Sequence, residues 1–319
     1  MRTGGKILLG CVATPFVLLL LFALLFLVFR AMPLPESAPT QAAQEPSGSV
    51  TLQQLEAEGL AVGAPEAPPG KAVSVTIWLE EGTFHVKPAP EGEGFRVEGQ
   101  YDKSMYDLKH EITRDRSGTA SFSLSFRPRY SMLRRILSAG FLHMDDETNK
   151  ITVYVPRGLP MELNLKSYKG ETNLDLTGLS LAKMDLDLGM GEHNMVVNEP
   201  NPLEMSALKV NQSMGEMELH GLANLRAGDI TIWGQMGELC LDLGESLLRD
   251  TKMYARMRMG EMSIGIPTDA RVQASSSMFL GETEGNPNRA EGAHRLELDV
   301  SSSMGELTYH DSHQLSDPL

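Results

Sequence analysis

The stretch SMGEMELHG, Ser213–Gly221, holds a Met-Gly-Glu triplet that leads into alternating apolar and polar residues. Similar stretches recur downstream and upstream as GMGEHNMVV, QMGELCLDL, RMGEMSIGI and SMGELTYH. Alternation of this kind is typical of a β-strand with one buried face, and a glycine inside it indicates a bulge or a corner. The recurrence predicts that the triplet is part of the architecture rather than a catalytic motif.

A glycine followed by glutamate returns seven times, at intervals of 21, 24, 22, 23, 21 and 24 residues. A period near 22 residues is typical of a solenoid, in which each repeat packs only on its neighbours. Such a repeat is too short for two helices and rich in β-formers, so an all-β, β-solenoid-like stack is predicted. The predicted repeat corners are Gly170, Gly191, Gly215, Gly237, Gly260, Gly281 and Gly305, with Glu192, Glu216, Glu238 and Glu261 among the glutamates that follow them.

The triplet itself predicts a change of side-chain direction. In an uninterrupted strand Met236 and Leu239 would face opposite sides, yet both are apolar. A corner at Gly237–Glu238 would turn both inward, with methionine filling irregular space beside the bend. The glutamates would then form an outward column.

Three roles are open for these columns. The glutamates could cap backbone N–H groups at the corners, which we favour, or share divalent cations. A calcium site needs about six to eight oxygen ligands, and no Asp-rich repeat supplies them. The methionines could bind a soft metal, but alternation explains them as core. We therefore predict no metal and no cofactor.

The N-terminus predicts a membrane anchor. Residues 7–29 carry no charge, and as a helix they would span about 35 Å, against a bilayer core of about 30 Å. Arg2 and Lys6 precede this run, and only Arg30 follows it before Lys71. The bias of positive residues places the N-terminus in the cytoplasm. The chain is thus predicted to be a single-pass protein of the bacterial cytoplasmic (inner) membrane, with an extracytoplasmic C-terminal domain.

Composition divides the chain into five parts. Residues 1–30 are the cytoplasmic N-terminus and anchor, and the Pro-rich residues 31–70 form a flexible, disordered linker. Residues 71–160 alternate as strands and form an N-terminal β part of the domain. Residues 161–310 hold the repeats, and 311–319 are a polar tail.

One basic amphipathic segment interrupts the N-terminal β part. A short helix is expected near 131–138, with apolar residues on one face and arginines on the other. It either packs on the solenoid as a shield for an open end or contacts a membrane surface or partner. The residues for such a contact are Arg134, Arg135, Ile136 and Leu137.

Several function classes are disfavoured. The net charge of −14 opposes nucleic-acid binding, which needs a positive surface. No P-loop, HExxH or GxSxG motif is present, and no pair of carboxylates clusters as a glycosidase requires. Cys11 and Cys240 lie in unrelated segments, so no disulfide is expected. We predict that the chain is not an enzyme and identify no small-molecule substrate.

The repeats resemble the toast-rack, or putative-adhesin, superfamily of bacterial envelope proteins, which includes the C-terminal domain of cell-wall-active antibiotic response membrane proteins. The resemblance rests on ITVYVPRGLPMELNLKSYKGETNLDLTGLSL, LDLGMGEHNM, SMGEMELHGLANL, QMGELCLDLGE and MRMGEMSIGIP, and covers roughly residues 73–300. It implies a β-solenoid-like stack outside the membrane and, in some relatives, regulation of envelope stress sensing. It carries over no catalytic residues. The glycine usual in the family's G-x-G pair is replaced here at Ser213, Gln235 and Arg258.

These observations lead to two expectations for function. The first is a non-enzymatic scaffold that binds another envelope protein, in a cell-envelope stress response. The alternative is a surface adhesin or a self-assembling structural element that uses an open edge of the stack. A carbohydrate-active enzyme is a third, weaker reading.

Overall fold

A computed structural model describes residues 43–44, 72–103, 105–114, 120–130 and 149–312, and shows an all-β protein, as predicted. Within these residues, no helix has the length and apolar character needed to cross a membrane. The predicted anchor, residues 7–29, lies outside them. The elements are β1 (Ala43–Gln44), β2 (Val73–Pro88), β3 (Arg96–Tyr101), β4 (Tyr106–Arg114), β5 (Ala120–Pro128), β6 (Lys150–Val155), β7 (Met161–Asp175), β8 (Leu181–Val196), β9 (Met205–His220), the 3₁₀ turn η2 (Leu222–Leu225), β10 (Ala227–Asp242), β11 (Thr251–Ile266), β12 (Arg271–Glu284) and β13 (Arg295–Asp311).

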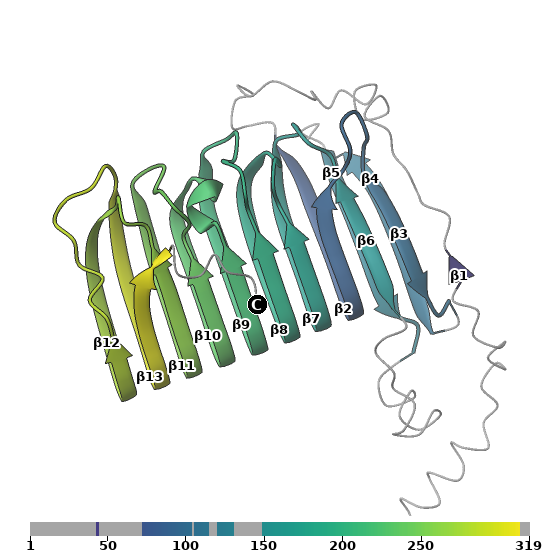
Figure 1. Cartoon of the computed structure of the whole chain (residues 1–319). Coiled ribbons are helices and arrows are strands. Elements are labelled where there is room, and N and C mark those ends of the chain that lie inside the picture. The colour runs from purple at the N-terminus through teal and green to yellow at the C-terminus, as the bar shows by residue number, and fades with distance from the viewer. Residues whose placement is uncertain (1–42, 45–71, 104, 115–119, 131–148, 313–319) are drawn as a thin grey trace, which may run out of the picture.

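The strands form one 13-stranded sheet (Figure 1). Its order is β1-β3-β6-β2-β7-β8-β9-β10-β11-β13-β12, with β5 also beside β2 and β4 beside β5. From β2 to β12 in this order all neighbours are parallel. Each long strand carries a glycine at which it bends, so it has a first limb and a second limb. We call one bent strand a rung.

The bends stack glycine on glycine. Gly215, Gly237 and Gly260 are partners in the register, and all have positive φ angles, +126° at Gly237. A Cβ atom added to Gly237 would lie 1.9 Å from the carbonyl oxygen of Gly215. Glycine is therefore required here twice, for the backbone conformation and for the approach of the next rung. The column also includes Gly82 of β2, which pairs with Gly170.

The core lies between the two limbs of every rung. In β8 the inward residues are Leu186 and Leu188 before the bend and Met195 after it, all buried. The segments that return from one rung to the next add leucines such as Leu222 and Leu243. Because the rungs are in register, each inward position continues into the next rung, and the core is one continuous cluster.

The N-terminal end of the stack is built from a divided rung. β5 pairs with the first limb of β2, and β6 pairs with its second limb. The chain between them, residues 129–149, is thus inserted where other rungs have a glycine corner. The predicted helix near 131–138 falls in this insertion, outside the described residues. β4 and β3 then pair antiparallel with β5 and β6 at the end of the sheet.

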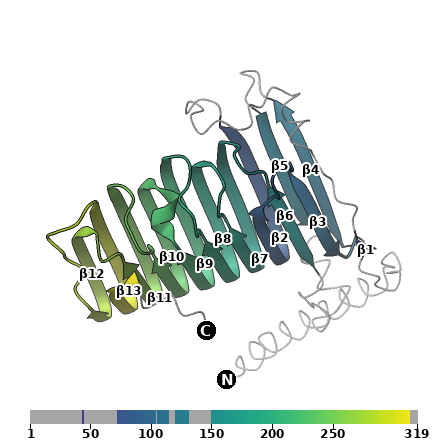
Figure 2. The same ribbon diagram turned by 45° about the horizontal axis from the view of Figure 1, so that its top comes forward.

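The C-terminal end departs from the order of the sequence. β13 inserts between β11 and β12, so that β12 forms the edge (Figure 2). Gly305 is consequently stacked between Gly260 and Gly281. Residues of the β12–β13 connection return along the start of β12, where Val272 and Arg289 exchange backbone hydrogen bonds of 3.0 and 3.1 Å.

Replacing Gly237 with alanine should destabilise the protein by about 3 kcal/mol or more, since strained backbone and a backbone clash add together. Gly158→Ala is the matched control, because Gly158 also has a positive φ of +70° but nothing lies within 4 Å of an added Cβ. Chemical denaturation of the full chain in detergent measures both. Equal losses at the two positions would contradict the close approach of the rungs.

Candidate functional site

The outer corner of the stack repeats two residue types along neighbouring rungs. Met190, Met214, Met236 and Met259 are partners along neighbouring rungs, and Met304 continues the column through its register neighbour Gly305. We call these five residues the Met column. A second column follows each glycine and consists of glutamates. In spatial order the Glu column contains Glu171, Glu192, Glu216, Glu238, Glu261, Glu306 and Glu282.

The prediction that the triplet methionines point into the core is wrong. All five have 41–45% of their surface exposed. In β9, Gln212 is buried, the next three side chains of Ser213, Met214 and Glu216 are exposed, and Met217 is buried again. The corner therefore occupies four residues, and the whole triplet faces outward. The inward positions are the ones that flank it.

The glutamates project outward, as predicted, but they do not cap the corners. No hydrogen bond joins a carboxylate of the Glu column to a backbone N–H group of the described residues, although Glu171 accepts one from the Asn173 side chain at 2.7 Å. Nor does any group of three or more His, Cys, Asp or Glu side chains in the described part of the chain converge as metal ligands. The column is a row of separate, solvated carboxylates.

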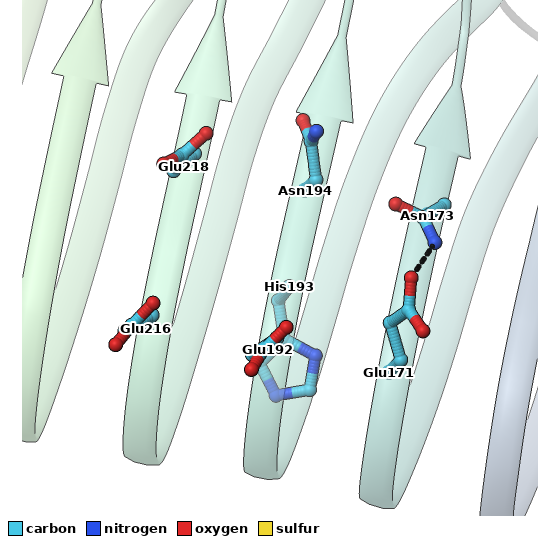
Figure 3. Close-up of a pocket in the computed structure, with 7 residues that line it drawn as sticks. All are labelled: Glu171, Asn173, Glu192, His193, Asn194, Glu216 and Glu218. Carbon is cyan, nitrogen blue, oxygen red and sulfur yellow. Dashed lines mark hydrogen bonds between the residues drawn. The ribbon is translucent and has the colours of Figure 1, made fainter. Parts of the chain in front are cut away.

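A shallow hollow of about 220 Å³ crosses the second limbs of β7, β8 and β9. Figure 3 shows its outer side chains, four glutamates and two asparagines, which project from the strands toward the viewer. The lining residues are Glu171, Asn173, Glu192, His193, Asn194, Glu216 and Glu218. The hollow is polar and acidic, and unlike an apolar ligand pocket it offers little surface to bury a small molecule.

His193 lies behind this acidic surface, in the core, with 3% of its surface exposed. Both ring nitrogens lack a hydrogen-bond partner, as do both side-chain polar atoms of Gln212 on the next rung. Burial lowers the pKa of His193 to about 4, opposed in part by the nearby backbone of Gly189. The imidazole is therefore neutral at pH 7, and its column neighbours in the register are Thr172 and Met217.

Cys240 is the free thiol of the second limb of β10. Burial raises its pKa to about 11, and the negative charges of Glu218, Asp242 and Glu238 act in the same direction. The thiol is protonated at neutral pH, which makes it a poor nucleophile.

The edge strand β12 exposes apolar side chains beside its corner. Phe279 has 82% of its surface exposed and Leu280 has 52%. Two inward positions of the same strand are polar, although Val272 at its start is buried in the core: Ser276 continues the column of Val300, and Thr283 continues the column of Leu307. Both are exposed, whereas Val300 and Leu307 are buried.

The predicted site residues fall into two groups. The seven predicted corner glycines share one column, whereas Arg134, Arg135, Ile136 and Leu137 lie outside the described residues. Sequence reasoning missed Gly82, whose context EEGT lacks methionine and glutamate at the expected places. It also missed the exposed edge at β12, for which the polar run at 275–277 was the available signal.

Comparisons with known proteins give low similarity to solved structures. No known family matches the sequence, and no curated protein matches it. Among solved structures, a "putative cell adhesion protein" from Clostridium sporogenes is 13% identical, with a TM-score of 0.38, over 78% of this chain and 96% of that one. A "putative adhesin" from Bacteroides fragilis is 12% identical, also with a TM-score of 0.38, over 85% of this chain and 99% of that one.

The buried His193 should make stability depend on pH. Its pKa is lower in the folded state than in the unfolded state, where it is about 6.5, so the unfolded chain binds more protons as the pH falls. The contribution of the neutral, buried His193 to the free energy of unfolding is full above pH 6.5 and is lost as the pH falls toward 4. The loss between pH 7.5 and pH 5 is about 2 kcal/mol.

Denaturation of the full chain at these two pH values tests the effect. His193→Met, which matches the next residue of the column, should flatten the pH dependence, and the exposed His110→Gln should leave it unchanged. The assignment fails if His193→Met retains the wild-type loss of stability at pH 5.

Proposed function

We propose that the chain is a non-enzymatic scaffold of the bacterial cell envelope, anchored in the cytoplasmic membrane through residues 7–29. Its β-solenoid would stand outside the membrane and bind another envelope protein through the uncovered corner of β12. The observation that carries this proposal is the exposure of Phe279 and Leu280 on an edge strand. Proteins normally cover, twist or charge such edges, since they pair readily with other chains.

The position of the exposed residues fits capture of an extended segment. The start of β12 is already covered by residues near Arg289, and the Ala274 N–H group donates to Asn288 Oδ1 at 2.8 Å. From Ser275 onward the strand pairs with β13 on its inner side, and on its outer side no strand of the described residues lies beside it. A partner strand would add backbone hydrogen bonds there and place an apolar side chain against Phe279.

The inward polar residues favour a different protein over a continued stack of copies. If another rung followed β12, it would enclose the hydroxyl group of Ser276, whose column is apolar in the neighbouring rungs at Val300, Ala255 and Ile232. Burying a hydroxyl without a hydrogen bond costs about 1–3 kcal/mol. A surface adhesin or self-assembling protein, using the same edge, is the alternative function.

A photoreactive amino acid at position 279, in the full chain expressed in its own cells, tests the proposal. Tyr168 is the matched control: it also lies two residues before a corner glycine and is 63% exposed, but inside the stack. We expect one partner protein to be captured from position 279 and not from position 168.

The captured protein should then bind the purified full chain directly, and Phe279→Ser should weaken that binding about tenfold or more, as for an anchor residue of an interface. Serine is tolerated at this place, since β13 has Ser303 there. Crosslinks between copies alone would support the self-assembling alternative. Equal capture from both positions, or none, would refute a docking edge at β12.

A further inference from the structure

The five exposed methionines have no structural reason to be methionine. Every exposed methionine of the described residues belongs to the Met column. The fold does not demand an apolar side chain there, because the same position is Lys169 in β7. Their exposed fractions of 41–45% place them outside the core. The fold therefore does not account for a surface row of thioethers.

The spacing of the column suits one kind of ligand. Neighbouring strands are about 4.8 Å apart, and the thioethers of adjacent rungs can approach one another because methionine has three flexible bonds. With metal–sulfur bonds of about 2.3 Å, two sulfurs on opposite sides of one ion are about 4.6 Å apart. Thioether ligands select soft ions, above all Cu(I).

The charge beside the column favours a cation. The Glu column runs parallel to it, one residue beyond the stacked glycines, and extends one rung further at each end, to Glu171 and Glu282. A surface hollow of about 420 Å³ is lined by both columns, with Met259 and Met304 on one side and Glu261 and Glu306 on the other. A row of carboxylates raises the local concentration of cations without acting as ligand to a soft one.

We propose that the Met column binds Cu(I), with thioethers from adjacent rungs as the ligands and the Glu column as the source of attraction. The essential feature is adjacency: two or three methionines on consecutive rungs form a site, and a methionine flanked by other residues does not. This site is separate from the edge at β12 and does not depend on the partner proposed for it.

Adjacency can be tested with the number of sulfurs held constant. The variant M190L/M214L keeps Met236, Met259 and Met304 on three consecutive rungs. The variant M214L/M259L also loses two sulfurs but keeps Met190, Met236 and Met304, none of which are neighbours. Leucine retains the apolar volume, and all three substituted positions are exposed, so folding should be unaffected, as circular dichroism and thermal melting will check.

Anaerobic titration with Cu(I) against a chromophoric copper(I) chelator measures the affinity. The full chain is used in detergent with Cys11→Ala and Cys240→Ala in every sample, so that thiols do not bind the ion. We expect M190L/M214L to bind nearly as the parent does. M214L/M259L should lose affinity by about tenfold or more, because even supporting residues around a metal commonly contribute that much.

Failure of the parent to compete with the chelator would overturn the proposal. So would equal affinities in the two double variants, whether both retained or both lost, since the ion would then be bound elsewhere or by single sulfurs. Because the readout is metal affinity alone, either result leaves the test of the β12 edge intact.

Discussion

The close contact between stacked corner glycines is the constraint on which the rest of the structure depends. Along the column, a Cβ atom at any of Gly170, Gly191, Gly215, Gly237, Gly260, Gly305 or Gly281 would fall 1.7–2.1 Å from the carbonyl oxygen of the preceding glycine. With hydrogen in that place, neighbouring rungs keep strand spacing through the bend. The pairing of residues therefore continues from the first limb into the second, and one register serves both.

A single register has a strong consequence for the surface. Apart from a register shift at Met161–Glu162, side chains stand above their equivalents in the next rung, so the surface consists of columns of equivalent residues. Inside, this arrangement is favourable, because apolar columns bury one another. It also places His193 and Gln212 in columns whose other members offer them no hydrogen bond. Outside, it aligns like charges, as in the Glu column, where repulsion is reduced by exposure to water and by salt.

The sequence predicted the all-β class and the glycines that stack at the corners, and it failed where the outcome depends on the packing of neighbouring strands. The alternation and the period identified the seven corner glycines, because glycine and glutamate return at nearly constant intervals. The direction of Met214 was missed because a period of two cannot show how many residues a corner occupies. The exchange of β12 and β13 left no trace either, since both strands have a similar length and the interval from Gly260 to Gly281 is normal.

The ends of the stack explain why its functional surfaces are limited in length. At the N-terminal end β3 and β4 run antiparallel to the rungs, so the parallel register cannot continue past them. At the other end two inward positions of β12, Ser276 and Thr283, are polar and exposed, and Phe279 is exposed as well. A column of equivalent side chains extends only over consecutive rungs, so it ends at both ends of the stack. The Met column stops one rung earlier still, at Lys169 and at Leu280. A thioether row confined inside a longer row of carboxylates does not follow from the repeat, which would extend both columns equally. The difference in length between the Met column and the Glu column therefore requires a chemical explanation and not a structural one.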